Sequence, residues 1–221
     1  TTYNSSNGNQ MWNVSVGAPS LMALFVGLSA NYLLTGNFMN ESNGLNIATV
    51  AAIAAYNVSY GDDEYLYNYA LTLVNATGRK ITQKILGNMT PMAFEKGNLN
   101  GDNVDDILAT SIDFEAHGLS HLLVFDGNSM NLSWSNNNSA MLMSGKVADF
   151  TNKSANDEIL VFGQVGGLPD PSPLFSQAIL ISGNGTILWS RVCIDPGFVS
   201  GISVGDYNGD TQLDFSFAMS S

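Results

Sequence analysis

One stretch near the C-terminus places oxygen-bearing side chains at alternate positions of a short loop. Asp206, Asn208, Asp210 and Asp214 alternate with other residues, and the backbone carbonyl of Gln212 occupies the seventh place. Calcium binds six to eight oxygens, drawn from carboxylates, side-chain amides and backbone carbonyls. Three carboxylates and one amide at this spacing therefore predict a structural Ca²⁺ site.

A second stretch repeats the pattern with two carboxylates. It offers Asn98, Asn100, Asp102 and Asp106, with the backbone carbonyl of Val104 in the seventh place. Crowded carboxylates repel one another when unpaired, so a bound cation would stabilise either loop. The alternative is that the Asn and Asp side chains form Asx-turns closed by hydrogen bonds within the loop.

Two weaker copies of the pattern begin at residues 37 and 149. Met39 stands where the first copy needs an oxygen ligand, and Lys153 places a cation near the centre of the other. We expect both copies to be metal-free or to bind metal weakly. Each instead carries an N-x-[ST] glycosylation sequence, at Asn40 and Asn152.

The four loops define a repeat. Their starts, Asn37, Asn98, Asp149 and Asp206, are 61, 51 and 57 residues apart, and the remaining 52 of the 221 residues are themselves one period. Short strands with Gly, Asn and Asp turns at such a period are typical of propeller blades. We therefore predict an all-β chain, with residues 1–221 forming a single β-propeller domain of four blades of four antiparallel strands. A linear array of hairpins is the alternative.

The three tryptophans mark a second repeated feature. Trp12, Trp134 and Trp189 each close a turn-then-strand pattern that precedes the next acidic loop. The last unit begins near Phe198 and stops after about two strands, whereas residues 1–16 resemble two outer strands. We expect the N-terminal strands to complete the C-terminal blade, which closes the ring without unpaired edges.

The loops resemble the FG-GAP or VCBS repeats of integrin-α-like β-propellers, whose motif is D-x-[DN]-x-D-G-x-x-D followed by a strand. Loops 206–214 and 98–106 carry the closest matches, and the four units together span essentially the whole chain. The resemblance implies the propeller fold that the repeat spacing also favours.

The amino-acid composition excludes some classes of function. Charged residues make up 12% of the chain, about half the usual share, and the net charge is −12. A nucleic-acid-binding protein needs Lys and Arg to displace counterions, so that class is excluded. The apolar run 20–34 is too short to span a membrane.

The glycosylation pattern occurs ten times, which predicts an extracellular or cell-surface protein kept soluble by N-linked glycans. An Asn- and Ser-rich turn composition is the alternative reading. The sequences begin at Asn4, Asn13, Asn40, Asn57, Asn75, Asn88, Asn131, Asn137, Asn152 and Asn184.

We find no set of residues that selects a catalytic mechanism, and we expect no enzyme. The chain has no G-x-S-x-G nucleophile elbow. His117 and His121 are predicted to be exposed loop histidines, and the acidic run 62–64 a solvated turn.

The favoured function is a calcium-stabilised, N-glycosylated structural or adhesion propeller, for example a surface-filament or surface-layer subunit. Its partners would be further copies of itself or other surface proteins and glycans. If residues 1–16 fill a neighbour's open blade, the copies form a head-to-tail chain. A carbohydrate-binding, lectin-like propeller is the alternative, and a hydrolase is least favoured.

Overall fold

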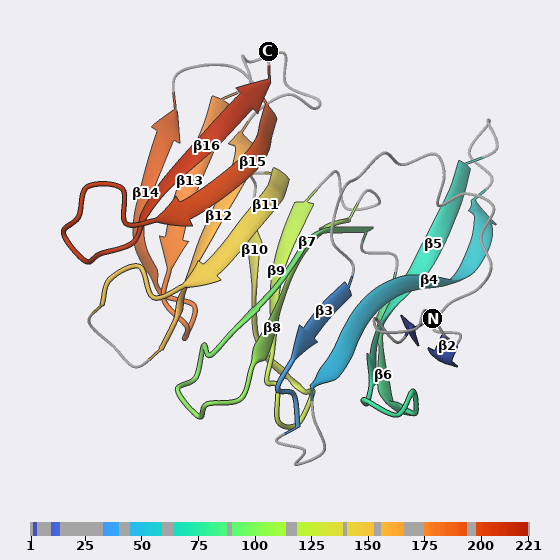
Figure 1. The fold of residues 1–221 in the computed structure, drawn as a ribbon. Helices are drawn as coiled ribbons and strands as arrows, with labels where there is room; N and C mark the ends of the chain where they lie inside the picture. The colour runs from blue at the N-terminus through green and yellow to red at the C-terminus, as the bar shows by residue number, and fades with distance from the viewer. Residues whose placement is uncertain are drawn as a thin grey trace.

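The computed structural model is all-β over the residues that it describes. These are residues 2–3, 10–13, 33–39, 45–58, 64–87, 90–113, 119–138, 141–152, 156–165, 175–193 and 198–220. Every regular element among them is a β-strand (Figure 1). Within these ranges no helix is long and apolar enough to cross a membrane.

Three sheets have four antiparallel strands each, joined in sequence order. The first sheet consists of β3 (Leu33–Gly36), β4 (Asn46–Val58), β5 (Glu64–Val74) and β6 (Lys80–Gly87). The second sheet consists of β7 (Thr90–Gly97), β8 (Asp106–Asp113), β9 (Leu119–Phe125) and β10 (Leu132–Asn138). The third sheet consists of β11 (Met141–Ala148), β12 (Glu158–Val165), β13 (Phe175–Ile181) and β14 (Ile187–Cys193). The predicted meander of four strands per unit is confirmed in these three sheets.

The remaining strands form two separate hairpins. The C-terminal hairpin pairs β15 (Phe198–Gly205) with β16 (Asp214–Ser220), and the N-terminal hairpin pairs β1 (Thr2–Tyr3) with β2 (Gln10–Trp12). The prediction that the N-terminal strands complete the C-terminal blade of the same ring is therefore wrong for the described residues. The N-terminal hairpin lies beside the first sheet, and the C-terminus lies at the opposite end of the molecule (Figure 1). No ring closes among these elements.

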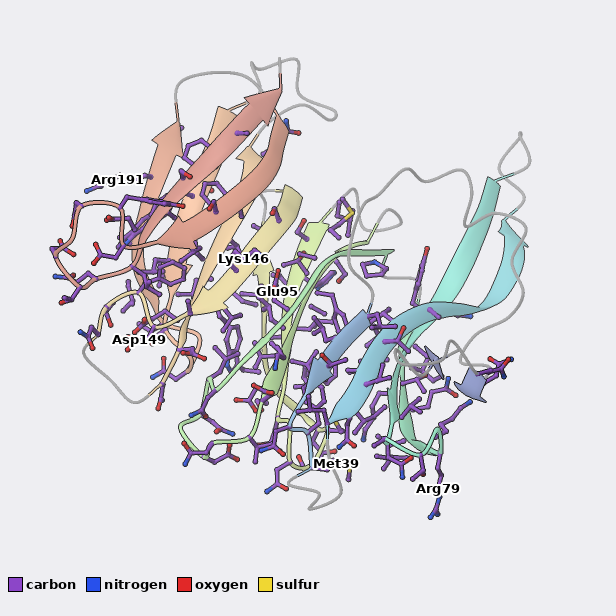
Figure 2. All side chains as sticks on the ribbon, in the orientation of Figure 1. Met39, Arg79, Glu95, Lys146, Asp149 and Arg191 are labelled. Carbon is purple, nitrogen blue, oxygen red and sulfur yellow. The ribbon has the colours of Figure 1, made fainter. Side chains whose placement is uncertain are left out.

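The sheets stack face to face in series. Their first strands are neighbours, with β3 contacting β7, β7 contacting β11, and β11 contacting β15. Three apolar clusters fill the successive interfaces. An ion pair between Glu95 on β7 and Lys146 on β11 also joins the second and third sheets, and Figure 2 shows the two side chains pointing toward one another.

The inner and outer strands differ because of this stacking. On β12, Ile159 and Val161 pack toward the second sheet while Leu160 and Phe162 pack toward the C-terminal hairpin. Successive side chains of a strand point to opposite faces, so a strand covered on both faces is apolar throughout. The outer strands β10 and β14 have mostly exposed side chains and are more polar in sequence.

Candidate metal-binding loops

Each acidic loop joins the first strand of its sheet to the second, as the repeat predicts. Loop 98–106 connects β7 to β8, and loop 206–214 connects β15 to β16. The loops 37–46 and 149–158 occupy the same place in the first and third sheets. Met39 and Asp149 mark these two loops in Figure 2, at one common edge of the stacked sheets.

Loops 98–106 and 206–214 have the same conformation at their first turn. Asn98 and Asp206, each first in its loop, accept hydrogen bonds from the N–H groups three and five positions later. The distances are 2.9 and 3.3 Å in loop 98–106 and 2.7 and 2.9 Å in loop 206–214. Three positions after the start, Gly101 and Gly209 have φ values of 81° and 80°, a region that favours glycine because it lacks a Cβ.

The later predicted ligands also face their own backbone. Asn100 and Asp102 each accept a hydrogen bond from the N–H two positions later, as Asn208 and Asp210 do, at 2.8–3.0 Å. The donors in the second of these turns are the N–H groups of Val104 and Gln212. Both loops therefore contain Asx-turn hydrogen bonds. Each oxygen that accepts one hydrogen bond keeps a lone pair available for a cation.

The final carboxylate fastens the start of its loop. Asp106 Oδ2 accepts from the Leu99 N–H at 3.0 Å, and Asp214 Oδ2 accepts from the Tyr207 N–H at 3.1 Å. Glu158 does the same in loop 149–158, where it accepts from the N–H groups of its second and third residues at 2.9 and 3.1 Å. An acid in this place is therefore explained by the loop's own hydrogen bonds, whether or not metal binds.

Loop 37–46 inverts this last contact. Asn46 stands in the place of the acid, and its Nδ2 donates to the Phe38 carbonyl at 2.5 Å. Met39 has a positive φ of 59°, and Asn40 lies outside the described residues, as does Lys153 of loop 149–158.

Loop 98–106 is partly buried within the stack, with Leu99, Val104 and Asp106 buried and Asn100, Asp102 and Asn103 exposed. The Asp106 side chain is 1% exposed, and its second oxygen accepts from the Gly127 N–H at 2.8 Å. Burial raises the pKa of Asp106 to about 6, although hydrogen bonds from Gly127 and Leu99 oppose the shift. Both oxygens of this candidate ligand are already engaged by protein groups.

Neighbouring loops are joined by reciprocal hydrogen bonds that the sequence analysis did not find. The Asn98 N–H donates to Asp157 Oδ2 at 2.7 Å, and the Asp157 N–H donates to the Asn98 carbonyl at 2.9 Å. Asn37 and Asp105 repeat this pair at 2.8 and 2.9 Å, with Lys96 Nζ 2.8 Å from the same Asp105 carboxylate. Burial raises the pKa of Asp157. These contacts fix the second sheet to both of its neighbours.

A sequence signal for these joints exists. Asp105 and Asp157 each directly precede the last acid of their loop, so the joint appears as a pair of adjacent acids. Leu213 occupies that position in loop 206–214 and packs against the cluster that contains Phe150. Loop 206–214 therefore has no carboxylate at the position that joins the other two loops to their preceding neighbours.

Loop 206–214 lies open to solvent. All residues from 206 to 212 are exposed, and backbone hydrogen bonds, the Thr211 N–H first among them, lower the pKa of Asp206. Within the described residues, no three carboxylate, His or Cys side chains converge closely enough to hold a metal ion. The fit to calcium thus rests on mixed carboxylate, amide and carbonyl oxygens, and loop 206–214 offers more accessible oxygens than loop 98–106.

The candidate histidines differ from the prediction. His121 lies within β9, not in a loop, and its Nδ1 is 2.9 Å from Asn137 Oδ1. Its Nε2 is buried with no partner among the described residues. The expectation of an exposed loop histidine is wrong here because β9 begins before this residue; His117, Asp62 and Asp63 lie outside the described residues.

Six of the glycosylation sequences have an Asn side chain that the structure describes, and five of these side chains are exposed, as attachment requires. These residues are Asn13, Asn131, Asn137, Asn152 and Asn184. Asn75 is half-buried, and its Oδ1 accepts two hydrogen bonds from Thr77 and one from the Arg79 N–H. Asn4, Asn40, Asn88 and the side chain of Asn57 lie outside the described residues.

A cavity of about 630 Å³ opens between the third sheet and the C-terminal hairpin. Trp189 stacks on Phe215 at one wall, with ring centroids 5.9 Å apart. The remaining lining comes from loops 149–158 and 206–214, the β13–β14 turn and nearby strand residues, including Phe150, Leu180, Ser182 and Leu213.

Comparisons with known proteins identify the fold and no family. No family model matches the chain, and no curated protein matches it. Among solved structures, it is similar to a rhamnogalacturonan lyase of Bacillus licheniformis, with a TM-score of 0.59 and 14% identity. The likeness covers 84% of this chain and 39% of that one, so the chain spans well under half of the lyase. At this identity the likeness concerns the all-β fold alone.

Proposed function

We propose that the chain is an extracellular, calcium-stabilised and N-glycosylated structural or adhesion protein at the cell surface. Its sheets act as blades of a propeller-type arrangement of the FG-GAP or VCBS kind. The serial stacking of four-stranded meanders with their first strands adjacent supports this arrangement. The proposal includes no catalytic role.

The observation that carries the calcium role is the shared conformation of loops 98–106 and 206–214. The two loops place a side-chain oxygen at the first, third, fifth and ninth positions and hold them with equivalent hydrogen bonds. Calcium would replace repulsion among Asp206, Asp210 and Asp214 by attraction, and would thereby fix β15 against β16.

A melting experiment with and without calcium tests the role. At a free calcium concentration about 100 times Kd, one site stabilises the native state by about 2.7 kcal/mol. For a chain of this size, we expect the melting temperature to rise by roughly 5–10 °C and to return on addition of chelator. Magnesium at equal ionic strength is the control. A melting temperature that ignores both calcium and chelator contradicts the calcium role.

Carbohydrate binding is the second candidate, and the aromatic cavity at Trp189 favours it. Stacked aromatic rings beside polar groups such as Glu158, Thr151 and Gln212 suit a sugar, which has apolar faces and a hydroxyl rim. A glycan array with native protein distinguishes this candidate, because binding that Trp189→Ala abolishes would favour a lectin.

A further inference from the structure

The turns that join the third and fourth strands of the three four-stranded sheets all carry a glycosylation sequence. They are the β5–β6, β9–β10 and β13–β14 turns, and their asparagines are Asn75, Asn131 and Asn184. Asn75 is half-buried and closes its own turn, whereas Asn131 and Asn184 are exposed. Because the two exposed asparagines occupy equivalent turns, the surroundings of each turn decide where an attached glycan lies.

One face of the β13–β14 turn is occupied by the second sheet. A Cβ added to Gly183 would lie 1.9 Å from the Leu99 carbonyl oxygen, which leaves no room for a side chain there. A Cβ added to Gly185 would lie 3.2 Å from the Trp134 ring. Trp134 Nε1 also donates a hydrogen bond to the Gly183 carbonyl at 2.8 Å. Contact between two sheets therefore fills this face of the turn.

The Asn184 side chain is held by the other face of the same turn. Its Oδ1 accepts hydrogen bonds from Ser182 Oγ at 2.6 Å and from the Thr186 N–H at 3.1 Å. Ser182 in turn lines the cavity of about 630 Å³ between the third sheet and the C-terminal hairpin. The amide to which a glycan would be attached is therefore fixed one hydrogen bond away from a residue that lines the cavity.

The cavity has the composition of a site for a sugar. The rings of Trp189 and Phe215 stack with their centroids 5.9 Å apart and their planes at 19°. Leu188, which also lines the cavity, is 46% exposed, and Thr151 and Gln212 add hydroxyl and amide groups. A sugar ring has apolar faces that pack on aromatic rings and a hydroxyl rim that bonds to polar side chains. A glycan in the cavity would remove apolar surface from water.

The corresponding position on the second sheet is already filled. Trp134 and Trp189 both lie on fourth strands. The β13–β14 turn covers the ring at Trp134, whereas the cavity takes that place at Trp189. A glycan on Asn131 therefore meets a covered tryptophan, and Asn131 Oδ1 accepts a hydrogen bond from Lys84 Nζ on the first sheet at 3.2 Å.

We propose that the first sugars of an N-linked glycan on Asn184 occupy the cavity and pack on Trp189. The glycan then joins the third sheet to the C-terminal hairpin, as the β13–β14 turn joins the third sheet to the second. This inference rests on the proposed function, because it requires that the chain is N-glycosylated. It also restricts the second candidate function, since free carbohydrate reaches the cavity only when Asn184 carries no glycan.

Two substitutions at one position separate the glycan from the turn. The turn is closed through the Thr186 backbone N–H and carbonyl, so Thr186→Ala removes the glycosylation sequence and keeps these bonds, while Thr186→Ser keeps both. In the glycosylated protein we expect Thr186→Ala to lower the melting temperature by roughly 2–4 °C, the loss of about one aromatic stacking contact. Thr186→Ser should leave the melting temperature unchanged.

Two controls decide whether that loss comes from the cavity. Ser133→Ala removes the Asn131 sequence from the equivalent turn, and we expect a clearly smaller shift because Trp134 is already covered. Equal shifts from Thr186→Ala and Ser133→Ala would overturn the proposal. In protein expressed without glycans, Thr186→Ala should change nothing. A similar loss there would come from the turn itself, and the proposal would fail.

NMR of the glycosylated protein measures the contact directly. We expect nuclear Overhauser effects between the Trp189 indole protons and sugar protons of the Asn184 glycan, and an upfield ring-current shift of those sugar signals. Trp189→Phe should move these signals, and Trp134 should give no contact with any sugar. An occupied Asn184 whose sugars show no contact with Trp189 would overturn the proposal.

Mass spectrometry separates this inference from the proposed function. We expect Asn184 to carry a glycan in the native protein. A bare Asn184 beside glycans at other sites would overturn the inference and leave the glycosylated function standing, whereas a chain bare at all ten sites would overturn both. On a glycan array, native protein with an occupied Asn184 should bind no oligosaccharide through Trp189. Binding that Trp189→Ala abolishes would show an open cavity, and the inference would fail.

Discussion

Loops 98–106 and 206–214 share one conformation but differ in how much of each loop is buried. The first contacts both neighbouring loops through Asp157 and Asn37, and its Asp106 is 1% exposed, while its residues 100, 102 and 103 remain exposed. The second faces solvent over residues 206–212. The difference shows that one loop motif serves either as a joint between sheets or as an open set of ligands, and that its neighbours decide which.

The largest expected difference concerns the final acid of each loop. Asp106→Ala leaves the N–H groups of Leu99, Asn100 and Gly127 without their acceptor, and we expect a loss of about 3 kcal/mol in the free energy of unfolding. In Asp214→Ala the orphaned Tyr207 N–H is in an exposed loop, so the loss without calcium should be under about 1 kcal/mol. Urea denaturation in chelator measures both. Similar losses would contradict the contrast between joint and open loop.

The calcium affinities of variants in the two loops give a second comparison. Asp210→Asn removes a charge from an accessible loop, and we expect calcium affinity to fall about tenfold, or about 1.4 kcal/mol. Asp102→Asn should change it less, because Asp106 of that loop already accepts protein hydrogen bonds at both oxygens. Isothermal titration calorimetry of the two variants gives the order. A larger effect from Asp102→Asn would place the stronger site in loop 98–106.

Alanine substitutions at Gly101 and Gly209 separate the cost of side-chain crowding from the cost of backbone strain. Gly101 and Gly209 have nearly equal positive φ values, so alanine should cost each about 1 kcal/mol from conformation alone. A Cβ on Gly101 would also lie 2.4 Å from Asn156 Oδ1, whereas a Cβ on Gly209 meets nothing within 4 Å. Gly101→Ala should therefore lower the melting temperature further than Gly209→Ala. Equal shifts would mean that loop 98–106 is no more enclosed than its counterpart.

The two loops should also titrate in opposite directions. Carboxyl NMR in chelator is expected to show a pKa of about 6 for Asp106 and a pKa below 3.8 for Asp206. A raised native pKa means that native Asp106 binds the extra proton between about pH 4 and 6, so its contribution to stability falls as pH rises through that range. The lowered pKa of Asp206 adds stability above about pH 4, which is lost as pH falls below it. Asp106→Asn should remove the first effect and leave the second.

Local pattern predicted the repeated unit well. The loop starts at Asn37, Asn98, Asp149 and Asp206 all lie between the first and second strands of their sheets. Trp134 and Trp189 both lie on fourth strands. These features were predictable because turn residues and strand alternation act over a few neighbouring positions. The Asx hydrogen bonds within each loop belong to the same class.

Contacts between units were not predictable in the same way. The joints of Asp105 and Asp157 connect residues 68 and 59 positions apart, and no spacing within one loop encodes them. The predicted ring closure failed for the same reason, since the placement of β1–β2 depends on which distant strand it meets. The availability of Asp106 Oδ1 for a metal likewise depends on the hydrogen bond from the Gly127 N–H, and Gly127 lies on another hairpin.

The sequence by itself determined the all-β character, the four loop positions and the conformation that loops 98–106 and 206–214 share. Each follows from side chains that bond to their own backbone within a few residues. Only the tertiary structure decided that loop 98–106 joins neighbouring sheets and buries Asp106, and that loop 206–214 is open to solvent. Those outcomes depend on burial and pairing between distant segments, which the order of residues within a loop leaves undetermined.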